Sequence, residues 1–276
     1  MHHPVLLQAV LDNLNVKPGG KYIDATLGEG GYTLAILERG GKVLAIDWDH
    51  QQIENFKLQI ANLKPNANFK FLILKQGNFS QIESIAKESG FYPVDGIVFD
   101  LGLSMRQIGE SGRGFSFKKI HEPLDMRIDI NEEETAADMV NGLNKEGLYE
   151  LFASYSEDLN SRIIAEKIVE SRIGRRIKTV GDLIVVIDKA IGRKDQGTYR
   201  RIFQALRIAV NHELHNLRQG LLGAMNLIGA EGRIVVVTFH SLEDRIVKKF
   251  GGGHLIKGDR NLQFERSAKL RVIKHD

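Results

Sequence analysis

The stretch DATLGEGGYTLAIL, residues 24–37, places three glycines within four positions and continues as an apolar, helix-like run. The segment KYIDAT, residues 21–26, is typical of a buried strand, so the glycines stand between a strand and a helix. Glycine at such a turn allows positive φ and lets a ligand approach the backbone closely. The stretch therefore predicts a loop for a nucleotide-type cofactor, although the loop alone does not say which one.

Strands and helices alternate outward from this loop. The strands predicted from continuous apolar runs are 21–26, 42–47, 69–79, 94–102 and 231–239, with 267–274 as a candidate for one more. Unbroken apolar strands separated by helices are typical of a parallel sheet that is covered on both faces. The sequence thus predicts a doubly wound α/β fold, Rossmann-like and with a mostly parallel sheet.

This alternation stops after residue 105 and returns near the end of the chain. We therefore predict an α/β domain made of residues 1–105 and 201–276, interrupted by a mostly helical insertion at 106–200. One part of the insertion, DLIVVIDKAI (182–191), fits a strand as well as a helix. A long amphipathic helix is expected from about residue 199, with Thr198 as its N-cap.

Composition excludes several kinds of site. The 276 residues include no cysteine, which excludes disulfides, thiolate metal sites and cysteine nucleophiles. No apolar run reaches the ~18 residues of a membrane span. The N-terminal sequence has no basic region and no cleavage site of a secretory signal. We expect a cytoplasmic protein with no membrane contact.

The net charge of +3 is unevenly distributed along the chain. Residues 1–159 carry 15 basic and 23 acidic side chains, whereas residues 160–207 carry 12 basic and 5 acidic ones. A second basic block, residues 245–276, has 9 basic and 3 acidic side chains. Such blocks suit a polyanionic partner, although solvated helical faces would give the same pattern.

The predicted strand ends decide between cofactors. A dinucleotide fingerprint needs a third glycine where this chain has Thr33, which disfavours NAD. Asp47 ends the second strand and can accept both hydroxyls of a ribose. Phe79 and Asp100 end the next two strands, so an aromatic ring and a second carboxylate join Asp47 at the same edge of the sheet. This set suits an adenosine ligand without a pyrophosphate, and S-adenosylmethionine fits better than NAD.

Nine segments in order along the chain then carry a family resemblance. They are HHPVLLQAVL, DATLGEGGYTLAIL, AIDWD, DGIVFDLGLS, RGFSF, PLDMR, FQALRIAVNHEL, TFHSLEDRIVKKF and RSAKLRV. The sequence resembles the RsmH (MraW) family of small-subunit (16S) ribosomal RNA cytosine-N4 methyltransferases. The resemblance implies a class I S-adenosylmethionine-dependent methyltransferase with an inserted helical domain. It also implies methylation of a cytidine in the decoding centre of bacterial 16S rRNA.

The resemblance also implies which residues bind the cofactor. These are Gly28, Gly30, Gly31, Tyr32, Asp47, Phe79, Asp100 and Gln107. Tyr32 stands where many members have histidine, and Met105 and Arg106 depart from the usual loop sequence. His2 matches the leading histidine of the family.

The chemistry of the reaction suggests two catalytic residues. The exocyclic amine of cytosine is a poor nucleophile, and an acceptor for its N–H groups would activate it. Asp100 is the carboxylate best placed to do so, and His240, in FHSLED, is expected on the substrate side. We expect Ser241 to cap the helix that follows. No metal site is expected, because His240, Glu243 and Asp244 match no usual zinc spacing.

The insertion is expected to recognise RNA. Candidate phosphate contacts are Arg113, Arg175, Arg176, Arg200 and Arg201, and the expected partner is 16S rRNA within the small ribosomal subunit. Tyr199, Phe203 and Phe239 are candidate platforms for a flipped base, although core positions explain them as well. Two other functions stay open: a non-catalytic RNA-binding or assembly factor, and an NAD-type oxidoreductase. A homodimer is compatible with these features, but the sequence does not determine the oligomeric state.

Overall fold

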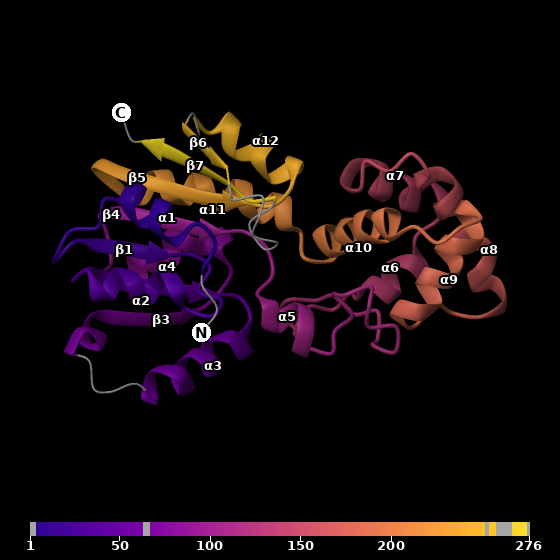
Figure 1. Cartoon of the computed structure of the whole chain (residues 1–276), viewed down its shortest axis with the longest axis horizontal. Helices are drawn as coiled ribbons and strands as arrows, with labels where there is room; N and C mark the ends of the chain where they lie inside the picture. Colours follow the sequence, from indigo (N-terminus) through magenta and orange to yellow (C-terminus); the bar gives the residue numbers. More distant parts are fainter. Residues whose placement is uncertain (1–3, 63–66, 252–253, 258–266, 275–276) are drawn as a thin grey trace. The chain divides into compact units, whose positions relative to one another are not determined.

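The computed structural model describes residues 4–62, 67–251, 254–257 and 267–274, so His2 lies outside the described residues. The chain forms two compact units (Figure 1). The first unit contains Met1–Gly102 and Leu214–Asp276, and the second contains Leu103–Glu213. The boundaries expected from the sequence were 105/106 and 200/201, and the second of these falls inside the helix Gln196–Val210, 13 residues before the boundary between the two units.

Within the described residues, seven strands of the first unit form one sheet in the order β3-β2-β1-β4-β5-β7-β6. Their bounds are β1 Lys21–Asp24, β2 Lys42–Asp47, β3 Leu72–Gln76, β4 Val94–Asp100, β5 Ile228–Thr238, β6 His254–Lys257 and β7 Lys269–Lys274. β1 to β5 pair in parallel, while β7 is antiparallel to β5 and β6 is antiparallel to β7. The predicted mostly parallel α/β fold is confirmed, including the strand near residue 270.

Helices cover both faces of this sheet. They are α1 Leu7–Leu14, α2 Gly31–Glu38, α3 His50–Ala61, α4 Ile82–Glu88, α11 Glu213–Leu227 and α12 Ser241–Lys249, with short 3₁₀ turns η1 Ala67–Phe71 and η2 Phe79–Gln81. α1, α2 and α3 share one apolar core with alternate residues of the strands, such as Val98 and Val235. Phe99 points to the opposite face, where it packs against Phe79 and Gly220 of α11.

The strand order reverses between β1 and β4, which lie side by side although β2 and β3 follow β1 in the sequence. In open α/β sheets a ligand binds outside the carboxyl ends of the strands at such a switch point. Asp24, Asp47 and Asp100 are the last residues of β1, β2 and β4. The fold therefore brings three carboxylates to the edge where a cofactor is expected.

The second unit is helical and has a core of its own. Its helices are α5 Met105–Glu110, α6 Ala136–Gly142, α7 Lys145–Tyr155, α8 Ser161–Gly174, α9 Val180–Ile191 and α10 Gln196–Val210. The ambiguous stretch at 182–191 lies in α9, whose apolar side enters this core. In the described part of this unit the sole β contact is an isolated bridge between Pro123 and Thr179.

Three local predictions were wrong. β3 ends at Gln76, and Phe79 begins the 3₁₀ turn η2 instead of ending the strand. The expected long helix is two helices, because α10 ends at Val210 and α11 begins at Glu213. Asp195, and not Thr198, caps α10 by accepting the backbone N–H of Gly197 and of Thr198.

Helix length and polarity bear on membrane insertion. Along the described ranges, every helix is too short or too polar to cross a bilayer.

Candidate active site

The glycine loop lies between β1 and α2, as predicted. Gly28 and Gly30 have φ of +50° and +78°, a region that favours glycine. A Cβ atom on Gly30 would come within 1.9 Å of the Phe56 ring, and one on Gly31 within 2.0 Å of Pro4. At Gly28 the nearest atom would be 3.9 Å away. Packing thus requires glycine at 30 and 31, whereas the side of Gly28 is open.

Asp47 holds this loop against the end of β2. Its Oδ2 accepts the N–H of Gly28 at 2.8 Å, and its Oδ1 accepts the N–H of Asp49 at 2.9 Å. Burial raises the pKa of Asp47 to about 7, although the two N–H donors oppose the rise. Each carboxylate oxygen can accept a further hydrogen bond, so both remain available to ligand hydroxyls.

Asp24 is a site residue that was not predicted from the sequence. Its Oδ2 accepts the hydroxyl of Thr33 at 2.7 Å, and its Oδ1 accepts the N–H of Thr26 at 3.3 Å. Burial raises the pKa of Asp24 to about 6. Its position directly before the glycine loop was the available signal. Thr33, which weakened the dinucleotide pattern, is the partner of this carboxylate.

Asp100 is the most perturbed carboxylate of the three. Burial raises its pKa to about 8, the negative charges of Asp24 and Glu243 add to the rise, and a hydrogen bond with the Tyr32 hydroxyl opposes it. Its N–H donates to Thr26 at 2.7 Å. Its Oδ1 is buried and has no hydrogen-bond partner among the described residues. The Tyr32 hydroxyl also lies within hydrogen-bond distance of the Val5 carbonyl, so its single hydrogen is shared between Asp100 and the N-terminal segment.

Raised pKa values give this edge a chemical preference. A carboxylate with a pKa of 6 to 8 is easily protonated when alone, and a nearby positive charge restores its negative form. The edge therefore favours a ligand that carries a cationic group. A sulfonium with an attached ribose fits these donors and acceptors better than a pyrophosphate, whose negative charge they would oppose.

Phe79 and Gln107, two of the predicted cofactor contacts, both have a structural role in the fold. The Phe79 ring meets Phe99 edge-on at 5.7 Å between centroids and packs over Gly220. Gln107 belongs to the second unit, where its side chain accepts the N–H of Ser104 in a capping box of α5. These contacts leave the predicted cofactor role of both residues without support from their geometry.

His240 caps α12, one residue earlier than the predicted cap at Ser241. Its Nδ1 accepts the N–H of Glu243 at 3.5 Å. Glu243 returns the contact, since its Oε2 accepts the N–H of Phe239 at 2.8 Å and of His240 at 3.3 Å. Asp244 is turned elsewhere and pairs with Lys269 and Arg271. Glu243, considered in the sequence only as a metal ligand, is the residue that positions the His240 turn.

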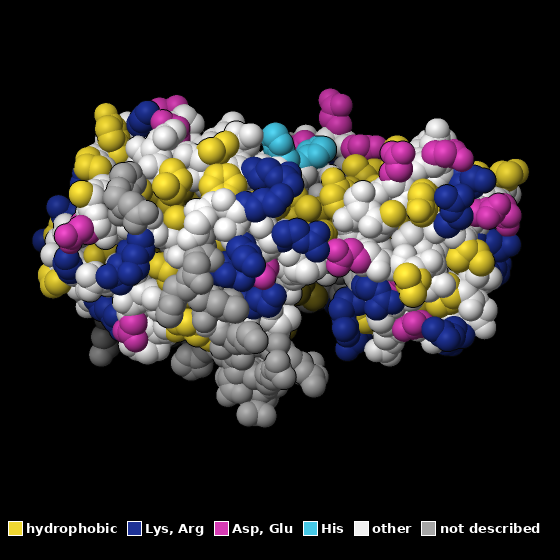
Figure 2. Space-filling model, turned by 90° about the horizontal axis from the view of Figure 1, so that it is seen from above, with side chains coloured by type: hydrophobic (Ala, Val, Ile, Leu, Met, Phe, Trp, Pro, Cys, Tyr) yellow, Lys and Arg dark blue, Asp and Glu magenta, His cyan; other side chains and the backbone are white. Residues whose placement is uncertain are grey.

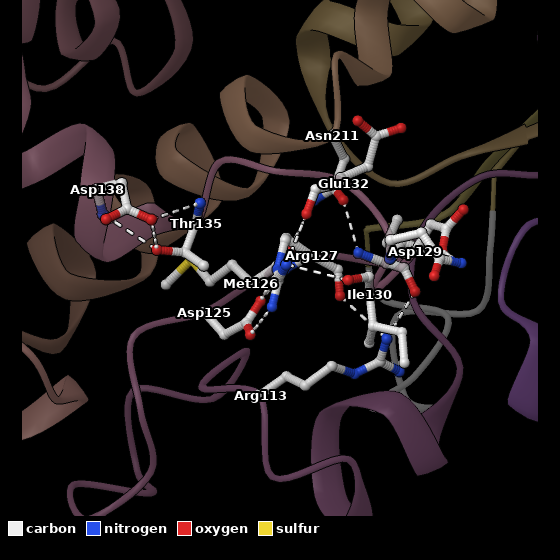
Figure 3. A network of polar contacts seen from close by, with 12 residues as sticks. Arg113, Asp125, Met126, Arg127, Asp129, Ile130, Glu132, Thr135, Asp138 and Asn211 are labelled. Atoms are coloured by element: carbon white, nitrogen blue, oxygen red, sulfur yellow. Dashed lines mark hydrogen bonds and ion pairs between the residues drawn. The ribbon is translucent and has the colours of Figure 1, made fainter.

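The second unit contains a polar brace built from PLDMR (Figure 3). Asp125 and Arg127 form an ion pair with two hydrogen bonds of 2.8 Å. Arg113 is 8% exposed and donates to the carbonyls of Arg127 and Ile128 at 3.0 and 2.6 Å. Arg113 is therefore part of this brace, and its geometry does not favour the predicted phosphate contact.

Comparison with known proteins decides the family. The model of the MraW methylase family matches residues 1–254. The chain belongs to the MraW methylase family. It is 44% identical over 254 residues to the ribosomal RNA small subunit methyltransferase H of Thermomicrobium roseum, covering 90% of this chain and 76% of that protein. The protein of the same name from Dictyoglomus thermophilum is 41% identical over 253 residues, covering 91% and 84%.

Membership of the MraW methylase family confirms the resemblance seen in the sequence and the S-adenosylmethionine-dependent methyltransferase class. The two relatives match most of this chain, including both units. The first unit of this MraW methylase holds the glycine loop, Tyr32, Asp47, Asp100 and His240. The second unit holds Gln107 and all the predicted arginine contacts.

The predicted arginines of the MraW methylase differ in their surroundings. Arg201 donates to Asp158 at 2.8 Å, and the Asp158 side chain is fully buried, so Arg201 neutralises a buried charge. Arg175 and Arg176 are exposed, and within the described ranges of the chain their ion pairs are long, 3.3 Å to Asp182 and 3.9 Å to Asp138. Arg200 is also exposed.

The burial of the candidate base platforms and the distribution of surface charge can also be described. Tyr199 and Phe203 are 6% and 4% exposed and belong to the core of the second unit, so they are not platforms for a base. On the face drawn in Figure 2, Lys and Arg side chains occur in several groups with Asp and Glu side chains between some of them. Arg175, Arg176 and Arg200 are therefore the predicted contacts that remain accessible to phosphate.

Proposed function

We propose that this protein transfers a methyl group from S-adenosylmethionine to the exocyclic N4 of a cytidine in 16S rRNA. The observation that carries the proposal is Asp100, a carboxyl group at the switch point with a raised pKa and a buried oxygen without a partner among the described residues. The relatives bear the name ribosomal RNA small subunit methyltransferase H, which supports small-subunit rRNA as the substrate.

The cofactor would lie across the ends of β1, β2 and β4. Asp47 would accept the ribose hydroxyls, and the open side of Gly28 leaves room for the ligand next to the loop. The carboxyls of Asp24, Asp47 and Asp100 would favour the cationic end. When bound, S-adenosylmethionine supplies a methyl group that is already activated by its sulfonium.

The protein positions the target amine and supplies a group that accepts its proton. Holding an amine at the right distance and angle is the main task in such a transfer. Asp100 accepts a hydrogen bond from the N4 amine, which directs the nitrogen lone pair toward the methyl group. It then takes the proton that the amine loses as the N–C bond forms. His240 lies at the end of the neighbouring strand and contacts the same base.

Composition excludes one alternative acceptor atom on the base, C5. Methylation of cytosine at C5 proceeds through attack of a cysteine thiolate on the ring. This chain has no cysteine. The exocyclic amine needs no covalent intermediate, so N4 is the position that these residues can serve.

The second unit would bind the RNA backbone. Arg175, Arg176 and Arg200 are exposed guanidinium groups that can contact phosphates without reading sequence. The rRNA within the small ribosomal subunit is the proposed form of the substrate. A homodimer stays a prediction, which light scattering of the purified protein would check.

The test is methyl transfer to 30S subunits isolated from cells that lack this modification. Incubation with S-adenosylmethionine carrying a labelled methyl group should label the 16S rRNA. An RNA-binding assembly factor without activity would bind the subunits and leave the rRNA unlabelled. Calorimetry should show binding of S-adenosylhomocysteine. Binding of NADH without binding of S-adenosylhomocysteine would favour the alternative function, an NAD-type oxidoreductase.

A further inference from the structure

Two buried polar atoms of the first unit lack a hydrogen-bond partner among the described residues. They are Oδ1 of Asp100, at the end of β4, and Nε2 of His240, two residues after the end of β5. Buried polar atoms in native proteins are nearly always paired, so an unpaired one points to a ligand, an ion or water. Two of them at the ends of adjacent strands suggest a single ligand with two polar groups.

The two residues lie in one neighbourhood. Asp100 is opposite Val237 in the parallel pairing of β4 and β5, and the N–H of Leu101 donates to the Val237 carbonyl at 3.0 Å. Beyond this pair, the Phe239 ring lies 3.3 Å from the position of a Cβ on Gly102. The charge of Glu243, the partner of His240, also raises the pKa of Asp100. The segments that follow the two strands therefore run side by side.

The hydrogen on His240 can be assigned from its contacts. Nδ1 accepts the N–H of Glu243, which places the ring proton of the neutral imidazole on Nε2. Oε1 of Glu243 lies 3.0 Å from Nε2, but the two atoms do not meet the geometry of a hydrogen bond. Nε2 is thus a donor that remains available to a ligand.

Asp100 supplies a hydrogen-bond acceptor, the counterpart of the His240 donor, once the cofactor is bound. With a pKa of about 8, its carboxyl is mostly protonated at pH 7 in the free protein. A sulfonium beside it favours the carboxylate, which makes Oδ1 an acceptor. The segments that follow β4 and β5 then present one acceptor and one donor.

This pair matches the Watson–Crick edge of cytosine. Cytosine offers an N4–H donor beside the N3 acceptor, whereas uracil offers an O4 acceptor beside an N3–H donor. Enzymes that act on a base take it out of the stack and bond this edge in the pocket. We infer that Asp100 and His240 together select cytosine: Oδ1 accepts N4–H, and Nε2–H donates to N3. The inference rests on the proposed function and adds a specificity role for His240.

Glu243 acts through His240 and is a positioning residue. Its carboxylate accepts two backbone N–H groups of the turn, and its own N–H fills Nδ1 of the ring. These contacts keep the Nε2 donor in one orientation. A base with the reversed pattern, such as uracil, would set donor against donor and acceptor against acceptor at the two atoms.

The test combines one change in the protein with one atom of the base. 3-Deazacytidine carries C–H in place of N3 and cannot accept the His240 bond. It would be placed in reconstituted 30S subunits at the cytidine that the wild-type enzyme methylates. His240→Asn keeps a side chain that caps α12 while it removes the imidazole. The initial rate of methyl transfer at low substrate gives kcat/KM for the four combinations.

We expect the wild-type enzyme to lose about 10- to 100-fold in kcat/KM on 3-deazacytidine, the usual range when one hydrogen bond to a buried partner is removed. His240→Asn should lose a similar factor on cytidine and lose little more on 3-deazacytidine. The matched control is His215→Asn, an exposed histidine of α11, which should behave as wild type on both substrates.

The outcomes separate this inference from the proposed function. If His240→Asn on 3-deazacytidine loses the product of the two single losses in kcat/KM, His240 does not contact N3. This result would overturn the inference and leave the proposed methyl transfer standing. No transfer by the wild-type enzyme to ordinary subunits would contradict the proposed function and the inference together. Circular dichroism of His240→Asn confirms that the variant is folded.

Discussion

At the scale of single residues, strand-end carboxylates carry the chemistry. Asp47 and Asp100 could be predicted because each follows an unbroken apolar run, and parallel strands bring their carboxyl ends together. Asp24 and Glu243 were missed because their roles depend on hydrogen bonds across a turn. Arg201 was predicted to contact RNA because it lies in the basic block 160–207, whereas Arg113 was suggested from its motif RGFSF. The partner of Arg201 is Asp158, 43 positions away, and local sequence does not show it.

Asp47→Ala should weaken S-adenosylmethionine binding by roughly 1–3 kcal/mol, because it removes acceptors for the ribose hydroxyls. The same change frees the N–H of Gly28, which loosens the loop. Calorimetry measures the affinity, and Asp12→Ala, an exposed carboxylate of α1, is the control. Unchanged affinity in a folded Asp47→Ala protein would remove Asp47 from the cofactor site.

Asp100 should release a proton when the cofactor binds. Its raised pKa of about 8 means that most of the free protein holds the proton at pH 7, and a cationic ligand lowers that pKa. S-adenosylmethionine should therefore release more protons than S-adenosylhomocysteine, whose sulfur is uncharged. Calorimetry in buffers of different ionisation enthalpy counts the protons. Equal release for the two ligands, or a difference that persists in Asp100→Asn, would show that Asp100 does not face the sulfonium.

At the scale of elements, most strands of the sheet could be predicted, whereas the ends and breaks of helices could not. The apolar pattern of α10 continues into α11, so the sequence predicted one helix. The break follows from Asn211, which is fully buried, donates to the Met126 carbonyl at 2.8 Å and accepts the N–H of Ile128 at 2.7 Å. These partners precede Asn211 by more than 80 residues, and periodicity contains no information about them. The strand β6 was missed for a similar reason, because its four residues gain their order from pairing with β7.

The two neighbouring arginines of α10 give a matched prediction. Arg201→Ala leaves the buried Asp158 carboxylate without its counter-charge and should lower the melting temperature of the protein. Arg200→Ala should leave the melting temperature unchanged and reduce affinity for 30S subunits, because Arg200 is exposed. Differential scanning calorimetry measures the melting temperature of the two variants, and a 30S binding assay measures their affinity for the subunit. The assignment fails if the two variants lose the same stability, or if only Arg201→Ala affects binding in a folded protein.

At the scale of the whole molecule, the two units are expected to divide the work. The first unit would hold the cofactor and the target base, and the second would hold RNA phosphates. Arg175→Ala/Arg176→Ala should weaken 30S binding and lower the slope of log affinity against log salt, by somewhat less than one unit for each phosphate that is no longer neutralised. Cofactor affinity should stay the same. The control is Lys57→Ala/Lys87→Ala, which removes two exposed charges of the first unit. An unchanged salt slope would make Arg175 and Arg176 ordinary surface residues, and failure of the double variant to bind cofactor would contradict the division.

The central claim is that the amine of a cytidine receives the methyl group, and the nucleoside product tests it most directly. The measurement is mass spectrometry of nucleosides from 16S rRNA after reaction of unmodified 30S subunits with S-adenosylmethionine carrying a deuterated methyl group. We expect labelled N4-methylcytidine with the wild-type protein and much less of it with Asp100→Asn. Labelled 5-methylcytidine, or the absence of any labelled nucleoside, would contradict the claim.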